Sequence, residues 1–152
     1  MYNLFLSYSK PINQQQINIL NYTKETLNRL NIHIVEVQNE CIDISPVFKI
    51  NDIIKQCDFF LCIAYEKDHY VDKNGKFYYT TSGWLDIEIA LAIAHNLPFC
   101  VIKEAKIKET TLLNSIDPIK YYILPNAQNN NLDFEYFKNN IMPLIIQNLN
   151  IV

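Results

Sequence analysis

A tryptophan and a glutamate four residues apart, Trp84 and Glu88, are the side chains best placed to do chemistry in this sequence. They lie in the segment TSGWLDIEIALAIA, residues 81–94, whose apolar character predicts a buried helix. Residues four apart share one face of a helix, so the indole and the carboxylate should lie side by side. A carboxylate on a largely buried helix is costly unless it is paired or opens on a cleft. The spacing alone leaves two interpretations open, a carboxylate in a cleft and one that faces solvent from the rim of the helix.

The elements that must position this pair alternate regularly along the chain. Short apolar runs predict strands at residues 2–7, 32–37, 59–65, 99–103 and 121–124. Apolar residues at helical spacing predict helices at residues 13–30, from Ser45-Pro46 onward, at 83–96 and at 132–149, the last divided or kinked by Pro143. This alternation favours a parallel sheet with helices on both faces, and the unbroken apolar run FFLCIAY at 59–65 predicts its central strand.

Helical spacing also predicts which residues face the core. They are Ile17, Leu20, Leu27 and Leu30 in the first helix, Val47, Ile50, Ile53 and Ile54 in the second, and Leu85, Ile89 and Ile93 in the third. Residues 66–81 are predicted to form a polar loop.

Ligands of parallel α/β sheets bind beyond the carboxyl ends of the strands. The first predicted strand ends at Ser7, Tyr8 and Ser9, which Lys10 follows, and the third ends at Tyr65-Glu66. These are therefore places where a ligand could bind, although Ser7 to Lys10 could equally be ordinary turn residues.

Composition argues against several classes of protein. The 152 residues, 49% of them apolar, predict one domain over residues 1–152 with its own core. No apolar run has the length of a membrane span, and the first residues lack the features of a signal peptide, so we expect a cytoplasmic protein without membrane contact. A net charge of -3 without a basic cluster argues against nucleic acid as a partner.

The glycine, cysteine and histidine residues argue against two further kinds of site, a glycine-rich phosphate loop and a metal site. The two glycines, Gly75 and Gly83, cannot supply a glycine-rich phosphate loop. There is no C-x-x-C pair and no H-E-x-x-H, so no metal site is expected. All four thiols are expected to be free; they are Cys41, Cys57, Cys62 and Cys100.

Four segments, in order, resemble the boxes of a TIR (Toll/interleukin-1 receptor) domain of the bacterial kind. FLSYS at 5–9 resembles the first-strand box, and IKQCDFFLCIAYEKDHY at 54–70 resembles the region of the third strand. SGWLDIE at 82–88 resembles S-x-W-x-x-x-E, the box that carries the catalytic glutamate of enzymatic TIR domains, and LPFCVI at 97–102 resembles the next strand. The resemblance covers about residues 1–125.

The sequence departs from the family pattern at two places. Residues 38–45, QNECIDIS, lack the glycine or proline-glycine of that family's mobile loop. Lys10-Pro11 follows the first box in place of the usual acidic residue. These departures concern loop contacts and self-association, and leave the glutamate box intact.

The resemblance implies a flavodoxin-like three-layer fold with about five parallel strands, and an enzyme that cleaves the nicotinamide–ribose bond of NAD+. It implies Glu88 as the catalytic residue, with Trp84 offering a flat face to the substrate. The other substrate-binding residues that it implies are Ser7, Tyr8, Ser9, Lys10 and Ser82. NAD+ is then a substrate, and no cofactor is expected.

A chain consisting of this domain resembles the signal-producing component of the Thoeris antiphage system. That likeness implies an ADP-ribose-type product, a cyclic isomer or a conjugate, which reaches a separate effector protein, and association with other TIR copies. Two alternatives stay open, a non-catalytic TIR–TIR interaction module and an N-glycosidase like the nucleoside deoxyribosyltransferases.

Other polar residues could compete with Glu88 for a catalytic role, but each has a simpler, non-catalytic interpretation. These are Glu66, Asp68 and Asp86 as solvated carboxylates, Asp58 as a strand boundary and His69 as a surface residue.

Overall fold

The computed structural model describes residues 1–37, 46–108, 110–116, 121–124 and 134–151. Five parallel strands form one sheet in the order β2-β1-β3-β6-β7. Their bounds are β1 (Tyr2–Tyr8), β2 (Ile32–Val35), β3 (Phe59–Ala64), β6 (Phe99–Glu104) and β7 (Tyr121–Leu124). The predicted parallel α/β sheet is confirmed, with the apolar third strand at its centre.

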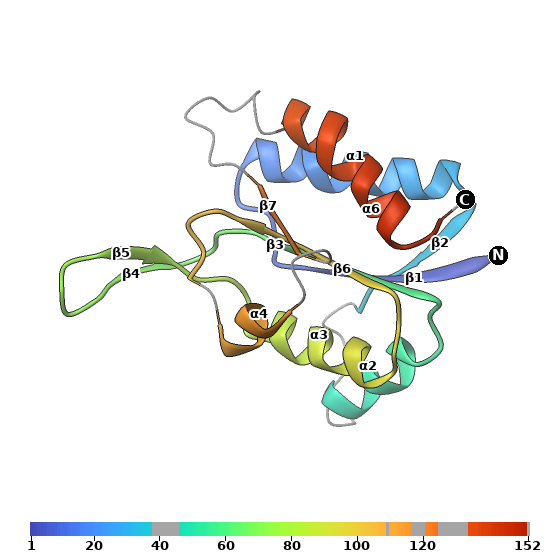
Figure 1. Ribbon diagram of the computed structural model, residues 1–152, viewed down its shortest axis with the longest axis horizontal. Helices are drawn as coiled ribbons and strands as arrows, with labels where there is room; N and C mark the ends of the chain where they lie inside the picture. Colours follow the sequence, from blue (N-terminus) through green and yellow to red (C-terminus); the bar gives the residue numbers. More distant parts are fainter. Residues whose placement is uncertain (38–45, 109, 117–120, 125–133, 152) are drawn as a thin grey trace.

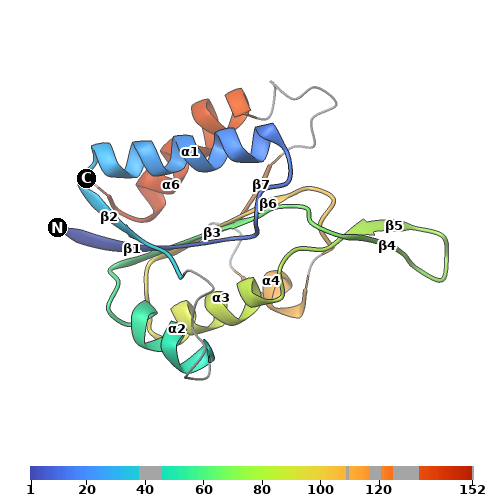
Figure 2. The ribbon, with the colours of Figure 1, turned by 180° about the vertical axis from the view of Figure 1, so that it is seen from behind.

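Helices cover both faces of the sheet, which makes three layers (Figures 1 and 2). One face carries α1 (Gln14–Arg29), the π-helical turn η2 (Phe137–Ile141) and α6 (Met142–Asn148). The other face carries α2 (Pro46–Ile54), α3 (Trp84–Ala94) and α4 (Thr111–Ser115). Pro143 lies in the first turn of α6, directly after η2, so the hydrogen-bonding pattern of the last helix changes next to the proline that was predicted to kink or divide it. The fold class is a flavodoxin-like α/β sandwich.

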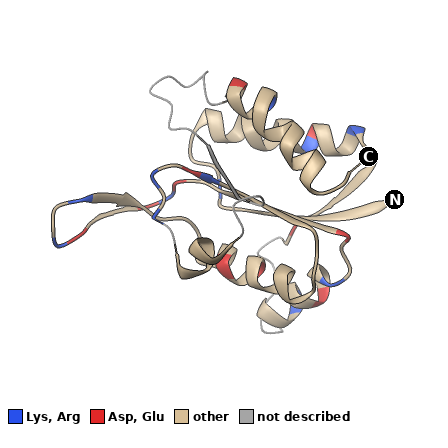
Figure 3. Cartoon of the chain, in the orientation of Figure 1, with Lys and Arg blue, Asp and Glu red and all other residues tan. Residues whose placement is uncertain are grey.

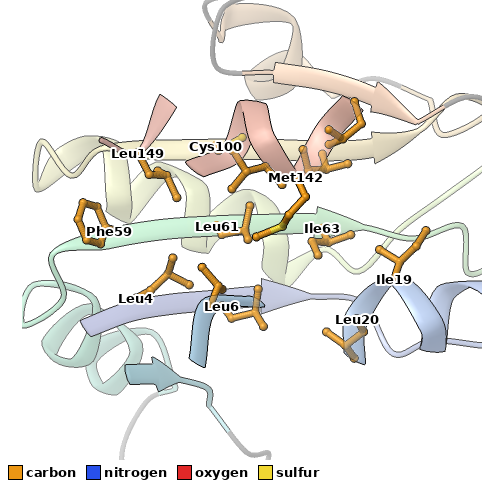
Figure 4. Close-up of a cluster of buried hydrophobic side chains, with 14 of the residues drawn as sticks. Leu4, Leu6, Ile19, Leu20, Phe59, Leu61, Ile63, Cys100, Met142 and Leu149 are labelled. Atoms are coloured by element: carbon orange, nitrogen blue, oxygen red, sulfur yellow. The ribbon is translucent and has the colours of Figure 1, made fainter. Parts of the chain in front are cut away.

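Two apolar clusters hold the layers together, one on each face of the sheet. Successive side chains of a strand point to opposite faces. Leu4 and Leu6 of β1 therefore pack toward α1 and α6, as Figure 4 shows, while Phe5 packs toward α2 and α3. All six residues of β3 are buried, because both clusters draw on this strand. The same alternation turns Ser7 and Ser9, two and four residues after Phe5, toward α3.

The predicted core faces of the helices need correction at four positions. Ile17 of α1, Leu30 directly after α1, and Val47 of α2 are each more than a third exposed. On α3, Ile93 is exposed, and Ala92 is buried in its place. The buried positions of α3 are Leu85, Glu88, Ile89 and Ala92. They follow the three- and four-residue spacing of one helix face, so the helix is not buried all round as its composition predicted.

Residues 66–81 form a hairpin where a polar loop was predicted. Strands β4 (His69–Val71) and β5 (Phe77–Tyr79) pair antiparallel and project beyond the sheet (Figures 1 and 2). The Asp72 carboxylate accepts backbone N–H bonds from Asn74 at 2.8 Å and Lys76 at 2.9 Å, and Gly75 has a φ of 77° that favours glycine.

Aromatic side chains line both faces of this hairpin. Tyr70 and Tyr78 stack with ring centroids 5.6 Å apart, and Phe77 stacks on His69 at 5.0 Å. The Nζ atoms of Lys76 and Lys108 each lie 5.1 Å from the centroid of the Tyr78 ring. Lysines on the hairpin and in the turn after β6 appear in blue in Figure 3. These contacts stabilise the hairpin, because strands this short form too few backbone hydrogen bonds to be stable alone.

The cysteines of the described residues are free and buried, namely Cys57, Cys62 and Cys100. Cys41 and the rest of residues 38–45, where the sequence departs from the TIR pattern, lie outside the described residues. Within the described ranges no helix combines the length and the apolar character that crossing a membrane requires.

Candidate active site

A cleft of about 760 Å³ opens at the carboxyl end of the sheet, next to β1. The chain goes from β1 to β2 on one side and then to β3 on the other, so the strand order reverses here. Such switch points are where parallel α/β sheets bind ligands. The lining of the cleft includes all seven residues that the sequence predicted for a site, which are Ser7, Tyr8, Ser9, Lys10, Ser82, Trp84 and Glu88.

Glu88 lies in the second turn of α3 and is 8% exposed. Its carboxylate oxygen Oε2 accepts a hydrogen bond from the hydroxyl of Ser7, which is itself buried. Burial raises the pKa of Glu88 because it disfavours the charged form, and the bond from Ser7 lowers it by a smaller amount. The structure thus places the glutamate in the cleft, the first of the two interpretations that spacing left open.

Ser9, directly after β1, forms hydrogen bonds to the end of β3 and to the segment before α3. Its hydroxyl oxygen accepts from the backbone N–H of Tyr65 at 2.8 Å and lies 3.1 Å from the Tyr65 carbonyl oxygen. A second hydroxyl, Thr81 Oγ1, lies 2.8 Å away in the segment that leads into α3. Ser9 is 1% exposed. Together, Ser7 and Ser9 therefore connect β1 to α3, to the segment before α3 and to the end of β3.

Tyr8 points to the opposite face of the sheet, as alternation along β1 requires, and reaches the cleft at its rim. The Nζ atom of Lys24 lies 5.2 Å from the centroid of the Tyr8 ring and 2.6 Å from a carboxylate oxygen of Glu36. Burial acts to lower the pKa of Lys24, but the hydrogen bond to Glu36 and the proximity of Tyr8 and Glu36 outweigh it and raise the pKa. Glu36 follows β2 and lines the cleft.

The remaining predicted residues lie at the mouth of the cleft. Trp84 begins α3 and is 43% exposed, so much of its indole is available to a ligand. Lys10 is exposed after β1. The backbone carbonyl of Ser82 accepts from the N–H of Leu85 at 3.1 Å, which shapes the first turn of the helix.

Sequence reasoning missed three charged residues of the lining, Glu36, Lys49 and Lys67. Glu36 and Lys67 follow β2 and β3 closely, so the rule that ligands bind at strand ends could have found them. Lys49 lies on α2, and nothing in its spacing marks it as a site residue. With Lys10 and Glu88, the described lining has three lysines and two glutamates. The cleft thus offers cationic groups for phosphate beside carboxylates for a positive charge.

The competing polar residues do not line the cleft. Asp58 accepts from the backbone N–H of Asn3 at 2.8 Å, which fits its predicted role at the start of β3. Asp86 accepts from Thr110 Oγ1 at 3.1 Å. Asp68 and His69 are exposed at the hairpin.

No family model matches the chain, and no curated protein matches it. Among solved structures, the CMP N-glycosidase BcmB of Clostridium botulinum is similar over 90% of this chain and 97% of its own, with 15% identity and a TM-score of 0.51. RosB with bound 8-demethyl-8-formylriboflavin-5'-phosphate is similar over 98% and 77%, with 9% identity and a TM-score of 0.58.

The TIR domains of the activated Roq1 resistosome share 17% identity over all of this chain and 86% of theirs, with a TM-score of 0.44. At these identities, the likenesses to BcmB and RosB show a common α/β fold and leave the activity open. The likeness to Roq1 is too weak to add to that conclusion.

Proposed function

We propose that this chain is an enzyme that cleaves the N-glycosidic bond of a nucleotide, with NAD+ as its substrate. The observation that carries the proposal is the position of Glu88. Its carboxylate is buried on a helix, opens on the cleft at the β1/β3 switch point and is held there by Ser7. A buried carboxylate of this kind is costly for folding and is therefore a candidate functional group.

The chemistry of the bond suits a carboxylate. When the bond between ribose C1′ and the nicotinamide nitrogen breaks, both bonding electrons leave with nicotinamide, and the positive charge moves to the ribose. That state resembles the oxocarbenium ion of glycoside hydrolysis. The Glu88 carboxylate can stabilise it electrostatically and accept a hydrogen bond from a ribose hydroxyl. Nicotinamide leaves as a neutral molecule, so its departure needs no proton donor.

The other charges of the cleft fit the rest of NAD+. Lys10, Lys49 and Lys67 can neutralise the pyrophosphate without a glycine-rich loop. The half-exposed indole of Trp84 offers a flat apolar surface on which a ring can stack. A cleft of this volume lies within the usual range for small-molecule sites.

The resemblance of four sequence segments to TIR boxes supports the same substrate. We therefore propose that the chain is a TIR enzyme, with an ADP-ribose-type nucleotide as its product. A water molecule at C1′ would give ADP-ribose, and an internal nucleophile would give a cyclic isomer. A signalling role in antiphage defence would follow from the cyclic or conjugated product.

A second candidate is an N-glycosidase that acts on a nucleoside monophosphate, as does the CMP N-glycosidase BcmB, which has a similar fold. A cytosine base leaves poorly as an anion and needs a proton. The raised pKa of Glu88 favours this alternative in one respect, because a protonated carboxyl group could supply that proton.

One experiment separates these functions. The purified protein and its Glu88→Gln variant are incubated in parallel with NAD+, CMP and deoxynucleosides, and the products are identified by mass spectrometry. Release of nicotinamide by the wild type but not by E88Q supports the proposal, and release of cytosine instead supports the second candidate. Turnover of none of them at high protein concentration would contradict both and favour the non-catalytic interaction module.

A further inference from the structure

The geometry assigns to Ser7 the role of positioning residue for Glu88: its hydroxyl holds one carboxylate oxygen in place and leaves the other to the ligand. The catalytic consequence of this role rests on the proposed function, whereas the positioning itself does not. The sequence alone suggested Ser7 as a residue that binds substrate. The structure shows its hydroxyl group donating a hydrogen bond to Glu88 Oε2.

The backbone fixes Ser7 where this bond requires it. Ser7 is in the interior of the sheet, because β1 pairs with β3 and the partner of Ser7 there is Cys62. Its side chain shares a face of β1 with Phe5, which packs in the α2 and α3 layer. Ser7 is 2% exposed, so its hydroxyl has little contact with solvent. A short side chain that is buried in this way has little freedom to move, so it holds a hydrogen-bond donor beside the carboxylate.

The two oxygens of the Glu88 carboxylate have different surroundings. Oε2 accepts from Ser7, and within the described residues Oε1 has no hydrogen-bond partner. The side chain lines the cleft, so Oε1 is the oxygen that a ribose hydroxyl or a developing cation would meet. Fixing one oxygen sets the direction of the other, which is the preorganisation that charge stabilisation needs.

The elements around the cleft carry other titratable groups besides the Glu88 carboxylate. Beneath it, β3 contributes the Cys62 thiol, whose pKa is raised by burial and by the nearby Glu88 charge, so this thiol stays neutral. The charged residues of the cleft are Lys10 after β1, Glu36 after β2, Lys49 on α2 and Lys67 after β3. Along α3 itself, Asp86 bonds to Thr110. The hydrogen bond that favours the ionised form of Glu88 comes from the hydroxyl group of Ser7.

The test is a titration of the Glu88 carboxyl carbon by 13C NMR in the wild type and in Ser7→Ala, with E88Q to assign the signal. A hydrogen bond to a charged group corresponds to a pKa difference of about 1 to 2 pH units. The midpoint for Glu88 should therefore rise by about that amount in S7A, because burial then acts without the compensating bond. Thr23→Val is the matched control, since it removes a buried hydroxyl of α1 that bonds to the Ile19 carbonyl at 2.8 Å, away from the cleft.

An unchanged midpoint in S7A, or an equal rise in T23V, would overturn the positioning role. Activity gives a second readout. With NAD+ as substrate, the acid limb of kcat/KM should move to higher pH in S7A, and kcat should fall about tenfold with little change in KM. If the wild type does not cleave NAD+, the proposed function fails, and the NMR titration still decides whether Ser7 positions the carboxylate.

Discussion

Replacing Glu88 by glutamine separates the charge of this residue from its size. The amide oxygen of glutamine can still accept the hydrogen bond from Ser7, so the packing at the cleft is preserved. A unit charge about 4 Å from a developing positive charge contributes about 4 kcal/mol at an effective dielectric constant of about 20. Since about 1.4 kcal/mol changes a rate tenfold, NAD+ turnover by E88Q should fall by a factor of about 10² to 10³.

The same substitution should raise stability near neutral pH. Burial raises the pKa of Glu88 in the folded protein above its value in the unfolded chain. The folded state then binds this proton more tightly, so the wild type loses stability as the pH rises through the folded pKa. E88Q has no such proton to lose. Its Tm should therefore exceed the wild-type Tm at pH 7, and the difference should shrink as the pH falls from 7 toward about 4, the ordinary pKa range of glutamate, where the wild-type carboxyl group is protonated in both states.

Two assays on the same preparations check these expectations. Thermal unfolding followed by circular dichroism between pH 4 and pH 8 gives the difference in Tm, and chromatography of nicotinamide gives the rate. An E88Q protein that folds normally and releases nicotinamide at the wild-type rate would refute a catalytic role for the charge. A difference in Tm that does not change with pH would refute the reasoning about burial.

Three further predictions concern packing and thiols. Phe60→Ala, in the central strand β3, should lower the free energy of unfolding by about 3 to 5 kcal/mol in urea denaturation, because Phe60 is fully buried; a change near zero would contradict its place in the core. Trp84→Ala should reduce turnover but lower the Tm less than F60A does, because Trp84 is 43% exposed; a larger loss of Tm than in F60A would make Trp84 a packing residue. In the folded protein at pH 8, Cys57 and Cys100 should react slowly with a thiol reagent, because burial raises the pKa of Cys57 to about 11 and that of Cys100 to about 12. Unfolding under non-reducing conditions should release four thiols per chain, and a smaller number would mean a disulfide.

The sheet and its layers could be predicted because each element carries its own local signal. The unbroken apolar run of β3 indicates a strand covered on both faces, and the structure buries all of it. Which side of α3 faces the sheet could not be predicted in the same way. Its apolar residues occur on every side, so the composition does not say whether Ala92 or Ile93 faces the sheet. The packing against β1 and β3 decides that, and it buries Ala92.

The hairpin was missed because its strands are only three residues long. Alternation over three residues is too short to stand out among polar neighbours. The turn did carry a signal, since Asn74-Gly75 between aromatic residues is typical of a hairpin turn. Reading that dipeptide with Tyr70 and Tyr78 on either side would have predicted β4 and β5.

The candidate site was predictable in its residue types and less so in its contacts. Sequence spacing placed Trp84 and Glu88 on one helix, and the strand-end rule pointed to Ser7. Nothing in the sequence pairs Ser7 with Glu88, which are 81 residues apart. Only the register of β1 against β3, and the side on which α3 packs, brings the two side chains together.

This pairing explains how one feature can be both a cost to folding and, on the proposed function, a benefit to catalysis. The burial that disfavours the Glu88 charge also limits its contact with water, which would otherwise screen that charge. A carboxylate in such a place attracts a nearby cation more strongly than one at the surface. The hydrogen bond from Ser7 stabilises the ionised form and so offsets part of the effect of burial on the pKa of Glu88. On the proposed function, a ribose that becomes positive in the cleft would supply a charge opposite to that of Glu88, so the stabilisation is largest in the transition state.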